Sequence, residues 1–216
     1  MRFVIPFAPA KSEDVPTVSH AVNQFPQNPA QIISCASCTT NCITPVVEVM
    51  GRRIGIRKAT MTTIHAYTSS QSIVDSGDKD YRRGRAASAN LIPASTGAAL
   101  ATAPRATRVK WKVRRRGRAS AGGRWIPGGH CCRHINRVFI EEAASERYRD
   151  VLAVTKELIV SSDLIQQAHT SIVDLSLTQV VDQDLVKIMS WYDNEWGYAN
   201  QMVREALHFS APDSKP

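Results

Sequence analysis

The chain reads Gln31-Ile-Ile-Ser-Cys-Ala-Ser-Cys-Thr-Thr-Asn-Cys42 and continues Ile43-Thr-Pro-Val-Val-Glu-Val-Met-Gly-Arg-Arg53. Apolar residues open this stretch and lead into a cluster of Ser, Cys and Thr. The second part looks helical, and Pro45 falls in its first turn, where a missing N–H costs little. We therefore predict a helix over 42–53, with Cys38 just before it.

Further segments alternate between strand and helix patterns. Strands are predicted over Arg57–Thr68, Ser171–Asp182 and Leu185–Tyr192, which are rich in β-branched residues or alternate in polarity. Helical spacing of apolar residues marks Asn136–Leu152 and Glu195–Phe209. Strands with flanking helices predict an α+β fold with a mixed, largely antiparallel sheet. No G-x-G-x-x-G follows a strand near the N-terminus, so no dinucleotide-binding fold is predicted.

Length and composition limit the class of protein to which the chain can belong. The chain has 216 residues, of which 43% are hydrophobic, so it can bury a core. It contains no run of eighteen or more apolar residues, and we expect no membrane span. The first residues make a poor signal peptide because two prolines break a short apolar stretch, so a cytoplasmic location is expected.

The five cysteines are Cys35, Cys38, Cys42, Cys131 and Cys132. An odd number without a secretory signal favours free thiols over a disulfide framework. The spacing of the first three could be read as a zinc site, but no second pair follows at zinc-ribbon distance. The adjacent cysteines of the second group match metal spacing still less well. We therefore predict no metal.

Positive charge is concentrated in one segment. The net charge is +8, yet Arg105 to Arg137 holds nine arginines and two lysines, and no acidic residue occurs between Asp80 and Glu141. Without these 11 charges the chain has 16 basic and 19 acidic residues, a net charge of −3. The segment invites a second interpretation as a basic arm for nucleic acid or anionic surfaces, with Trp111 and Trp125 available for stacking.

Cys38 and His65 are the candidates for chemistry. A thiol near a helix N-terminus feels the positive end of the helix dipole, which favours the thiolate. Neighbouring hydroxyls and Asn41 can donate hydrogen bonds to an anionic ligand. A histidine beside a thiol can form an ion pair with it and act as general acid or base. Taken singly, a buried structural cysteine and a half-buried histidine remain open readings.

Three blocks in register resemble the glyceraldehyde-3-phosphate dehydrogenases. Ala36-Ser-Cys-Thr-Thr-Asn-Cys42 looks like the active-site signature of that family. His65-Ala-Tyr-Thr-Ser-Ser-Gln71, Arg82-Arg-Gly-Arg-Ala-Ala87 and Ile92-Pro-Ala-Ser-Thr-Gly-Ala-Ala99 are similar to the stretch that follows it. Ser190-Trp-Tyr-Asp-Asn-Glu-Trp-Gly-Tyr198 resembles a turn that contacts the cofactor.

The resemblance implies an aldehyde oxidation that uses NAD or NADP and inorganic phosphate. Cys38 would form a thiohemiacetal and then a thioester, which phosphate cleaves to an acyl phosphate, while His65 activates the thiol. Ser37, Thr39, Thr96 and Gly97 would hold the attacking phosphate, Thr68 and Arg83 the substrate phosphate, and Asn194 the nicotinamide amide. Glyceraldehyde 3-phosphate is the expected substrate, with erythrose 4-phosphate as an alternative within the family. The family assembles as homotetramers through the sheet of this domain, so a homo-oligomer is expected.

The chain departs from the family pattern in two places. Residues 1–30 resemble the end of the nucleotide-binding domain and a linker, and residues 31–216 resemble the catalytic domain. Most of the cofactor domain is absent from these residues, so we expect little activity from this chain alone. Residues 101–135 do not resemble the family and read like a segment translated out of frame. We expect that segment to be an irregular basic insert where a sheet strand should pass; resequencing the gene would test the frameshift hypothesis.

Overall fold

The computed structural model describes residues 4–10, 12, 14–23, 32–98, 102, 121–124, 131–182 and 184–210, with the backbone alone at 121–124. Its helices and strands are α1 (Cys38–Arg53), β1 (Ala59–Thr60), β2 (Ala121–Arg124), α3 (Cys132–Ala143), β3 (Leu152–Thr155), β4 (Ser171–Val181), β5 (Leu185–Trp191) and α4 (Trp196–Ser210). Two short 3-10 helices, η1 (Glu146–Tyr148) and η2 (Ser161–Leu164), join them.

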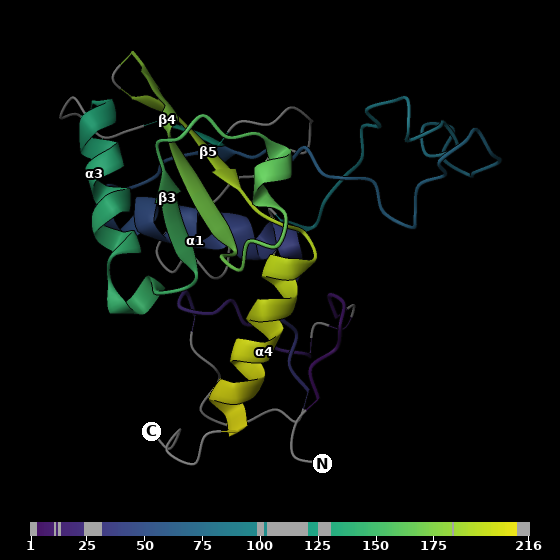
Figure 1. Cartoon of the computed structure of the whole chain (residues 1–216), viewed down its shortest axis with the longest axis horizontal. Helices are drawn as coiled ribbons and strands as arrows, with labels where there is room; N and C mark the ends of the chain where they lie inside the picture. The colour runs from purple at the N-terminus through teal and green to yellow at the C-terminus, as the bar shows by residue number, and fades with distance from the viewer. Residues whose placement is uncertain are drawn as a thin grey trace.

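The five strands form one sheet in the order β1-β2-β5-β4-β3. Neighbouring strands are antiparallel except β3 and β4, which are parallel. The helices α1 and α3 lie alongside this sheet (Figure 1). The predicted α+β class with a mixed, largely antiparallel sheet is therefore confirmed.

The core lies between the two helices and the sheet. Buried side chains from α1, α3, β3, β4 and β5 meet there, among them Val49, Phe139, Leu152, Val173 and Val186. Each of these is at most 2% exposed. Because the sheet and both helices contribute to one apolar cluster, the helices are held against the sheet by hydrophobic burial.

The first helix starts four residues earlier than the apolar pattern indicated. Ser37 is its N-cap, and the side-chain oxygen of Ser37 accepts a hydrogen bond from the backbone N–H of Thr40. The Ser37 hydroxyl also lies 2.9 Å from that of Thr40. Cys38 is consequently the first residue of α1 rather than a residue in the loop before it.

The expectation of an irregular segment over 101–135 is wrong at β2 and α3. The four residues of β2 pair with β5 on one side and with β1 on the other, so the neighbouring strands are not left unpaired. Backbone pairing requires no particular side chain, and Ala-Gly-Gly-Arg can fill a strand position whose partners are already in place. The beginning of α3 at Cys132 also falls in this segment. Residues 103–120 and 125–130 lie outside the described part of the chain.

Two predicted elements are shorter than expected. Of the strand predicted over 57–68, the structure has Ala59–Thr60 as β1, which pairs with β2 at two positions within the described residues. The helix predicted over 136–152 runs instead from Cys132 to Ala143 and is followed by η1 and the start of β3. The strands predicted over 171–182 and 185–192 and the helix predicted over 195–209 are confirmed as β4, β5 and α4 within one residue at each end.

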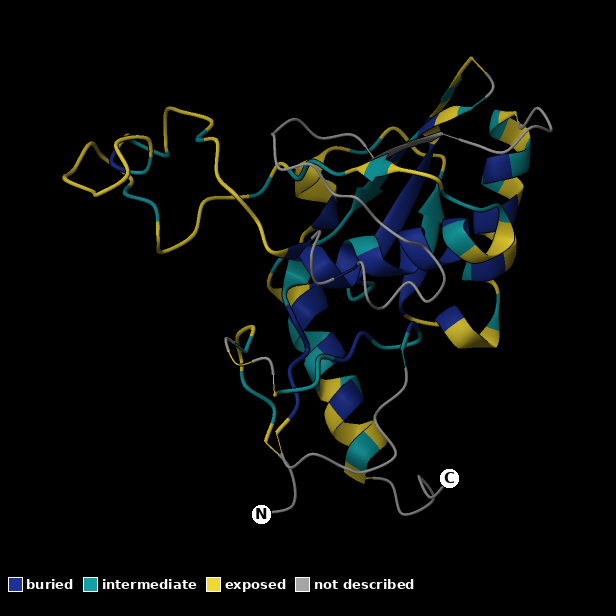
Figure 2. Cartoon of the chain, turned by 180° about the vertical axis from the view of Figure 1, so that it is seen from behind, coloured by how far each residue is buried: buried dark blue, intermediate teal, exposed yellow. Residues whose placement is uncertain are grey.

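Residues 66–96 form a long arm that projects from the sheet (Figure 1). It is held together by its own hydrogen bonds, such as those from Ser76 N–H to the Gly84 carbonyl and from Ala87 N–H to the Ser72 carbonyl. Much of it is exposed (Figure 2), including Tyr81 at 91%. Beyond the arm, Ala98 is buried and its carbonyl accepts a hydrogen bond from Thr102.

The N-terminal residues lie against the C-terminal helix. His20 Nδ1 is 2.5 Å from a carboxylate oxygen of Glu205, which is buried on α4. Backbone bridges from Val4 to Ile32 and from Thr17 to Ser34 link the same segment to the residues that precede α1. The described residues of segment 4–23 therefore pack with the residues that precede α1 and reach the side of α4.

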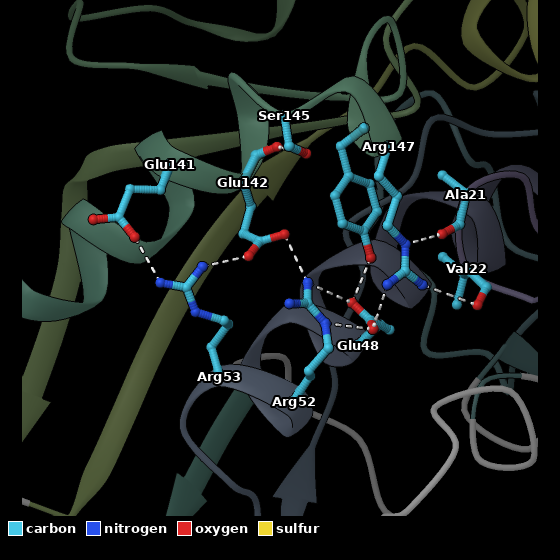
Figure 3. Close-up of polar contacts among 10 residues, drawn as sticks. Ala21, Val22, Glu48, Arg52, Arg53, Glu141, Glu142, Ser145 and Arg147 are labelled. Atoms are coloured by element: carbon cyan, nitrogen blue, oxygen red, sulfur yellow. Dashed lines mark hydrogen bonds and ion pairs between the residues drawn. The ribbon is translucent and has the colours of Figure 1, made fainter.

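A chain of ion pairs joins α1 to α3 (Figure 3). Arg52 contacts Glu48 at 2.8 Å and Glu142 at 2.6 Å, and Arg53 contacts Glu142 at 2.5 Å. Arg147 extends the chain to Glu48 at 3.2 Å. Both Glu48 and Glu142 are buried, so these carboxylates are compensated by the arginines rather than by water.

Candidate active site

Cys38 occupies the position where a thiol gains most from a helix. It is the first residue of α1, whose first turn contains no acidic side chain. Backbone N–H groups of that turn have no partners within the helix and present partial positive charge. The Cys38 side chain is half-buried, so it can meet both these groups and a ligand.

The structure places His65 next to this thiol. The distance from Cys38 Sγ to His65 Nε2 is 3.3 Å. His65 lies on the irregular segment that follows β1, not within a strand as its pattern suggested. The two residues are 27 positions apart, and the fold brings their side chains within hydrogen-bonding distance.

Each partner favours the charged form of the other. Burial of the Cys38 sulfur opposes ionisation, but the hydrogen bond and charge of His65, helped by Thr39, lower the pKa of the thiol below its usual value. The hydrogen bond to Cys38 likewise raises the pKa of His65 despite partial burial of the ring. Such opposed shifts are those expected of a thiolate–imidazolium pair.

The second ring nitrogen of His65 defines which tautomer is present. His65 Nδ1 is 2.6 Å from the backbone carbonyl of Ala66, and a carbonyl can only accept a hydrogen bond. Nδ1 therefore carries a hydrogen, which leaves Nε2 of the neutral ring free to accept the thiol proton. The backbone of the next residue thus prepares His65 to act as a base toward Cys38.

The other cysteines near the site are not comparable nucleophiles. Burial, with the charge of Glu205, raises the pKa of Cys35 to about 12. Burial raises the pKa of Cys42 to about 11, and its sulfur points toward the hydroxyl of Ser190 at 3.5 Å. Cys38 is thus distinguished from both neighbours in the same signature.

Two of the predicted phosphate-binding residues lie beside Cys38. Ser37 caps the helix, and Thr39 follows Cys38 in its first turn. The Thr39 hydroxyl is 2.9 Å from that of Tyr192 and 4.0 Å from the Cys38 sulfur. Tyr192 was not predicted as a site residue; its position two residues before Asn194 in the third resembling block was the available signal.

The remaining predicted phosphate-binding residues lie on or next to the arm. Thr68 is exposed and bonds to Ser70 and Gln71 within its own turn. The backbone of Arg83 bonds to Asp80, again within the arm. Thr96 accepts a hydrogen bond from Ala98 N–H, and Gly97 is next to it. Among the described residues, no hydrogen bond connects these four residues to Cys38 or His65.

Asn41 has a structural role instead of the predicted ligand-binding one. Its side-chain NH2 group donates to the carbonyls of Cys35 at 2.7 Å and Ser37 at 3.0 Å. The side chain is buried, with 3% of the residue exposed. Both hydrogens are therefore used to shape the turn before α1, where Ala36 adopts a left-handed φ of 61°.

Asn194 lies in the turn between β5 and α4 and is partly exposed. Its neighbour Asp193 holds that turn by accepting hydrogen bonds from the N–H groups of Glu195 and Trp196. A carboxamide in this place can both donate to and accept from a second carboxamide, so Asn194 fits a nicotinamide amide chemically.

In the described part of the chain, no group of three or more His, Cys, Asp or Glu could hold a metal ion. No described helix is long and apolar enough to cross a membrane. Of the eleven basic residues between 105 and 137, only Arg124, Arg133 and Arg137 fall within described residues, so the nucleic-acid interpretation lies largely outside them.

The chain matches the family model described as glyceraldehyde 3-phosphate dehydrogenase, C-terminal domain, over residues 37–114 and 132–194. The chain belongs to this family. The unmatched interval, 115–131, lies inside the segment 101–135, whose remaining residues the family model matches. The match includes Cys38, His65 and Asn194.

Relatives of the chain carry the same family name. A glyceraldehyde-3-phosphate dehydrogenase of Streptomyces coelicolor is 41% identical over 91% of this chain and 61% of its own length. One from Mycobacterium bovis is 42% identical over 93% of this chain and 61% of its own length. A chloroplastic enzyme of Nicotiana tabacum, glyceraldehyde-3-phosphate dehydrogenase A, is 40% identical over 91% and 52%. The chain therefore spans about three fifths of the length of the bacterial relatives.

Proposed function

We propose that this chain carries the thiol chemistry of a phosphorylating aldehyde dehydrogenase acting on glyceraldehyde 3-phosphate. The observation that carries the proposal is the contact of 3.3 Å between Cys38 Sγ and His65 Nε2 at the start of a helix. Family membership and the names of the relatives support glyceraldehyde 3-phosphate as the substrate and a dehydrogenase reaction. Erythrose 4-phosphate is the alternative substrate within the family.

His65 moves the protons in the proposed reaction. Nε2 takes the thiol proton, and the Cys38 thiolate adds to the aldehyde carbon, breaking the carbonyl π bond. His65 returns the proton to the resulting oxygen, giving a thiohemiacetal. As hydride leaves the carbon, His65 removes the hydroxyl proton and a thioester remains on Cys38. Inorganic phosphate attacks that thioester, and the thiolate departs to release an acyl phosphate.

The hydride acceptor would be NAD or NADP. Asn194 would hold its nicotinamide amide, and the group supplies the hydride-accepting ring when it is bound. The sequence contains no G-x-G-x-x-G turn for the pyrophosphate. We therefore expect these 216 residues by themselves to turn over slowly. A spectrophotometric assay with NAD+, NADP+, phosphate and substrate tests this expectation, and robust turnover would contradict it.

The phosphate groups would be held by hydroxyls, a backbone N–H and a guanidinium, which suit tetrahedral oxyanions. We propose that the attacking phosphate is bound by Ser37, Thr39, Thr96 and Gly97. Thr68 and Arg83 would contact the substrate phosphate, which requires the arm to lie over the site in the complex. We also propose that the chain forms a homo-oligomer, which light scattering of the purified chain would test.

The proposal is tested by alkylation of Cys38 with iodoacetamide, followed by peptide mass spectrometry as a function of pH. We expect the rate at Cys38 to stay high near pH 6, where ordinary thiols are protonated, and to fall at least tenfold there in His65→Asn. Free cysteine, alkylated with the same reagent over the same pH range, provides the comparison. A Cys38 profile like that of free cysteine, unchanged in His65→Asn, would remove the basis of the proposal.

A further inference from the structure

The hydroxyl of Tyr192 lies between the two chain segments that carry Cys38 and His65. It is 2.9 Å from the hydroxyl of Thr39 and 3.0 Å from that of Thr63. Thr39 follows Cys38 in α1, and Thr63 precedes His65 by two residues. Tyr192 itself directly follows β5. One side chain at the end of a sheet strand therefore links the thiol segment to the imidazole segment.

The ring of Tyr192 contacts the imidazole as well. The centroids of the Tyr192 and His65 rings are 5.9 Å apart, with an interplanar angle of 65°, an edge-to-face arrangement. Tyr192 thus contacts the imidazole segment twice, through its ring at His65 and through its hydroxyl at Thr63. Since that segment has no strand pairing after β1 among the described residues, these contacts help to fix where the imidazole lies.

The direction of the hydrogen bonds among the hydroxyls of Thr63, Tyr192 and Thr39 decides whether Thr39 can donate to the Cys38 sulfur. Burial raises the pKa of Tyr192 to about 12, so the phenol keeps its hydrogen at neutral pH. Each hydroxyl has one hydrogen to donate. If Thr63 donates to Tyr192 and Tyr192 donates to Thr39, the hydrogen of Thr39 is left for the Cys38 sulfur, 4.0 Å away. A donor of this kind stabilises the thiolate over the thiol. The opposite order would leave Thr39 no hydrogen for the sulfur.

We propose that Tyr192 is a positioning residue for the Cys38–His65 pair, acting through a relay of hydroxyls from Thr63 through Tyr192 to Thr39. The inference rests on the proposed function, because it concerns the same thiolate. In the plainer alternative the three hydroxyls only satisfy one another's hydrogen bonds. That alternative predicts no change at the thiol when the tyrosine hydroxyl is removed, provided that the chain stays folded.

The test is the pH profile of Cys38 alkylation in the full chain, read by peptide mass spectrometry with iodoacetamide as the probe. Tyr192→Phe removes the hydroxyl and keeps the ring that contacts His65. Tyr198→Phe is the matched control, because Tyr198 is a second tyrosine near the start of α1, where it is buried and its hydroxyl donates to the Ala36 carbonyl at 3.2 Å. Circular dichroism of each variant checks that it is folded.

We expect Tyr192→Phe to lower the alkylation rate at pH 6 by about three- to tenfold and to leave the rate at high pH unchanged, as a rise of the thiol pKa by up to one unit would do. Tyr198→Phe should follow the parent profile. Thr63→Val, which removes the first hydroxyl of the relay without altering Tyr192, should shift the profile in the same direction. Combining it with Tyr192→Phe should add little, because both changes break one relay.

The outcomes separate the two proposals. A parent chain with an acid-shifted Cys38 profile that Tyr192→Phe and Thr63→Val leave unchanged would overturn the inference and leave the proposed function intact. Equal shifts in Tyr192→Phe and Tyr198→Phe would also overturn it, since the effect would not depend on the link to His65. A parent thiol that titrates like free cysteine would refute the proposed function, and the positioning role with it.

Discussion

Replacing Glu142 by Gln should destabilise the protein by removing the charge at the centre of the ion-pair chain in Figure 3. The Glu142 side chain is 7% exposed, and its carboxylate accepts hydrogen bonds from Arg52 at 2.6 Å and Arg53 at 2.5 Å. Gln has nearly the same shape, so packing is kept. However, one of its two terminal groups is an NH2, which cannot accept a bond from an arginine.

The size of the effect follows from the contacts and their exposure. Each hydrogen bond to a charged group is worth about 1.5–3 kcal/mol, and Gln can retain one weakened bond. The arginines recover part of the loss, because Arg52 is 40% and Arg53 34% exposed and each keeps a second carboxylate partner. We therefore expect a net loss of about 2 kcal/mol in the free energy of unfolding. For a chain of this length that corresponds to a Tm lower by roughly 4–8 °C.

Urea denaturation followed by circular dichroism measures this loss, and Glu141→Gln is the matched control. Glu141 is the neighbouring residue on α3 and contacts the same Arg53 at 2.6 Å, but its side chain is 47% exposed. An exposed pair of this kind should contribute less than about 0.5 kcal/mol. Equal midpoints for the two variants would refute the reasoning that burial, and not the presence of an ion pair, sets the contribution.

Three further predictions use the same denaturation assay. Burial opposes ionisation of Glu142, but the arginines lower the pKa of its carboxyl group. The stability that Glu142 contributes should therefore be complete above the ordinary carboxyl pKa and disappear as the pH falls through the lowered pKa of the folded state. A difference in unfolding free energy between the parent and Glu142→Gln that grows in acid would contradict this. Phe139→Ala, at a core position with 0% exposure, should cost about 3–5 kcal/mol in unfolding free energy, and a loss under 1 kcal/mol would show that Phe139 does not pack as described. Ser37→Ala should cost about 1 kcal/mol because the N–H of Thr40 loses its cap, whereas Ser37→Gly should cost only a few tenths; the reverse ranking would argue against the capping role.

Local pattern was sufficient for most of the secondary structure near the C-terminus. The strands β4 and β5 and the helix α4 lie within one residue of their predicted limits, because polarity patterns there match the burial of each element. The segment after β1 was misjudged. Its β-branched residues suit a strand, but a strand also needs a partner, and among the described residues β2 pairs with β1 and not with the segment that follows it.

The basic segment shows the converse case, a strand that the local sequence does not predict. Nothing in Ala121-Gly-Gly-Arg124 resembles a strand, yet these residues pair with β5 over their whole length. Pairing there depends on the free edge of β5, which is a property of the assembled sheet. Composition could indicate only that the segment was unusual.

For the site, the sequence by itself determined the candidate thiol, the candidate base and the family signature around them. Only the tertiary structure decided that Cys38 is the first residue of α1 and that His65 Nε2 lies 3.3 Å from its sulfur. It also showed that Asn41, a candidate donor to a ligand, instead donates to backbone carbonyls of the turn before α1. The fold likewise brings Tyr192 between the segments that carry Cys38 and His65. The physical reason is that hydrogen bonds depend on distances between atoms, and residues 27 or more positions apart acquire those distances only when the sheet and helices pack together.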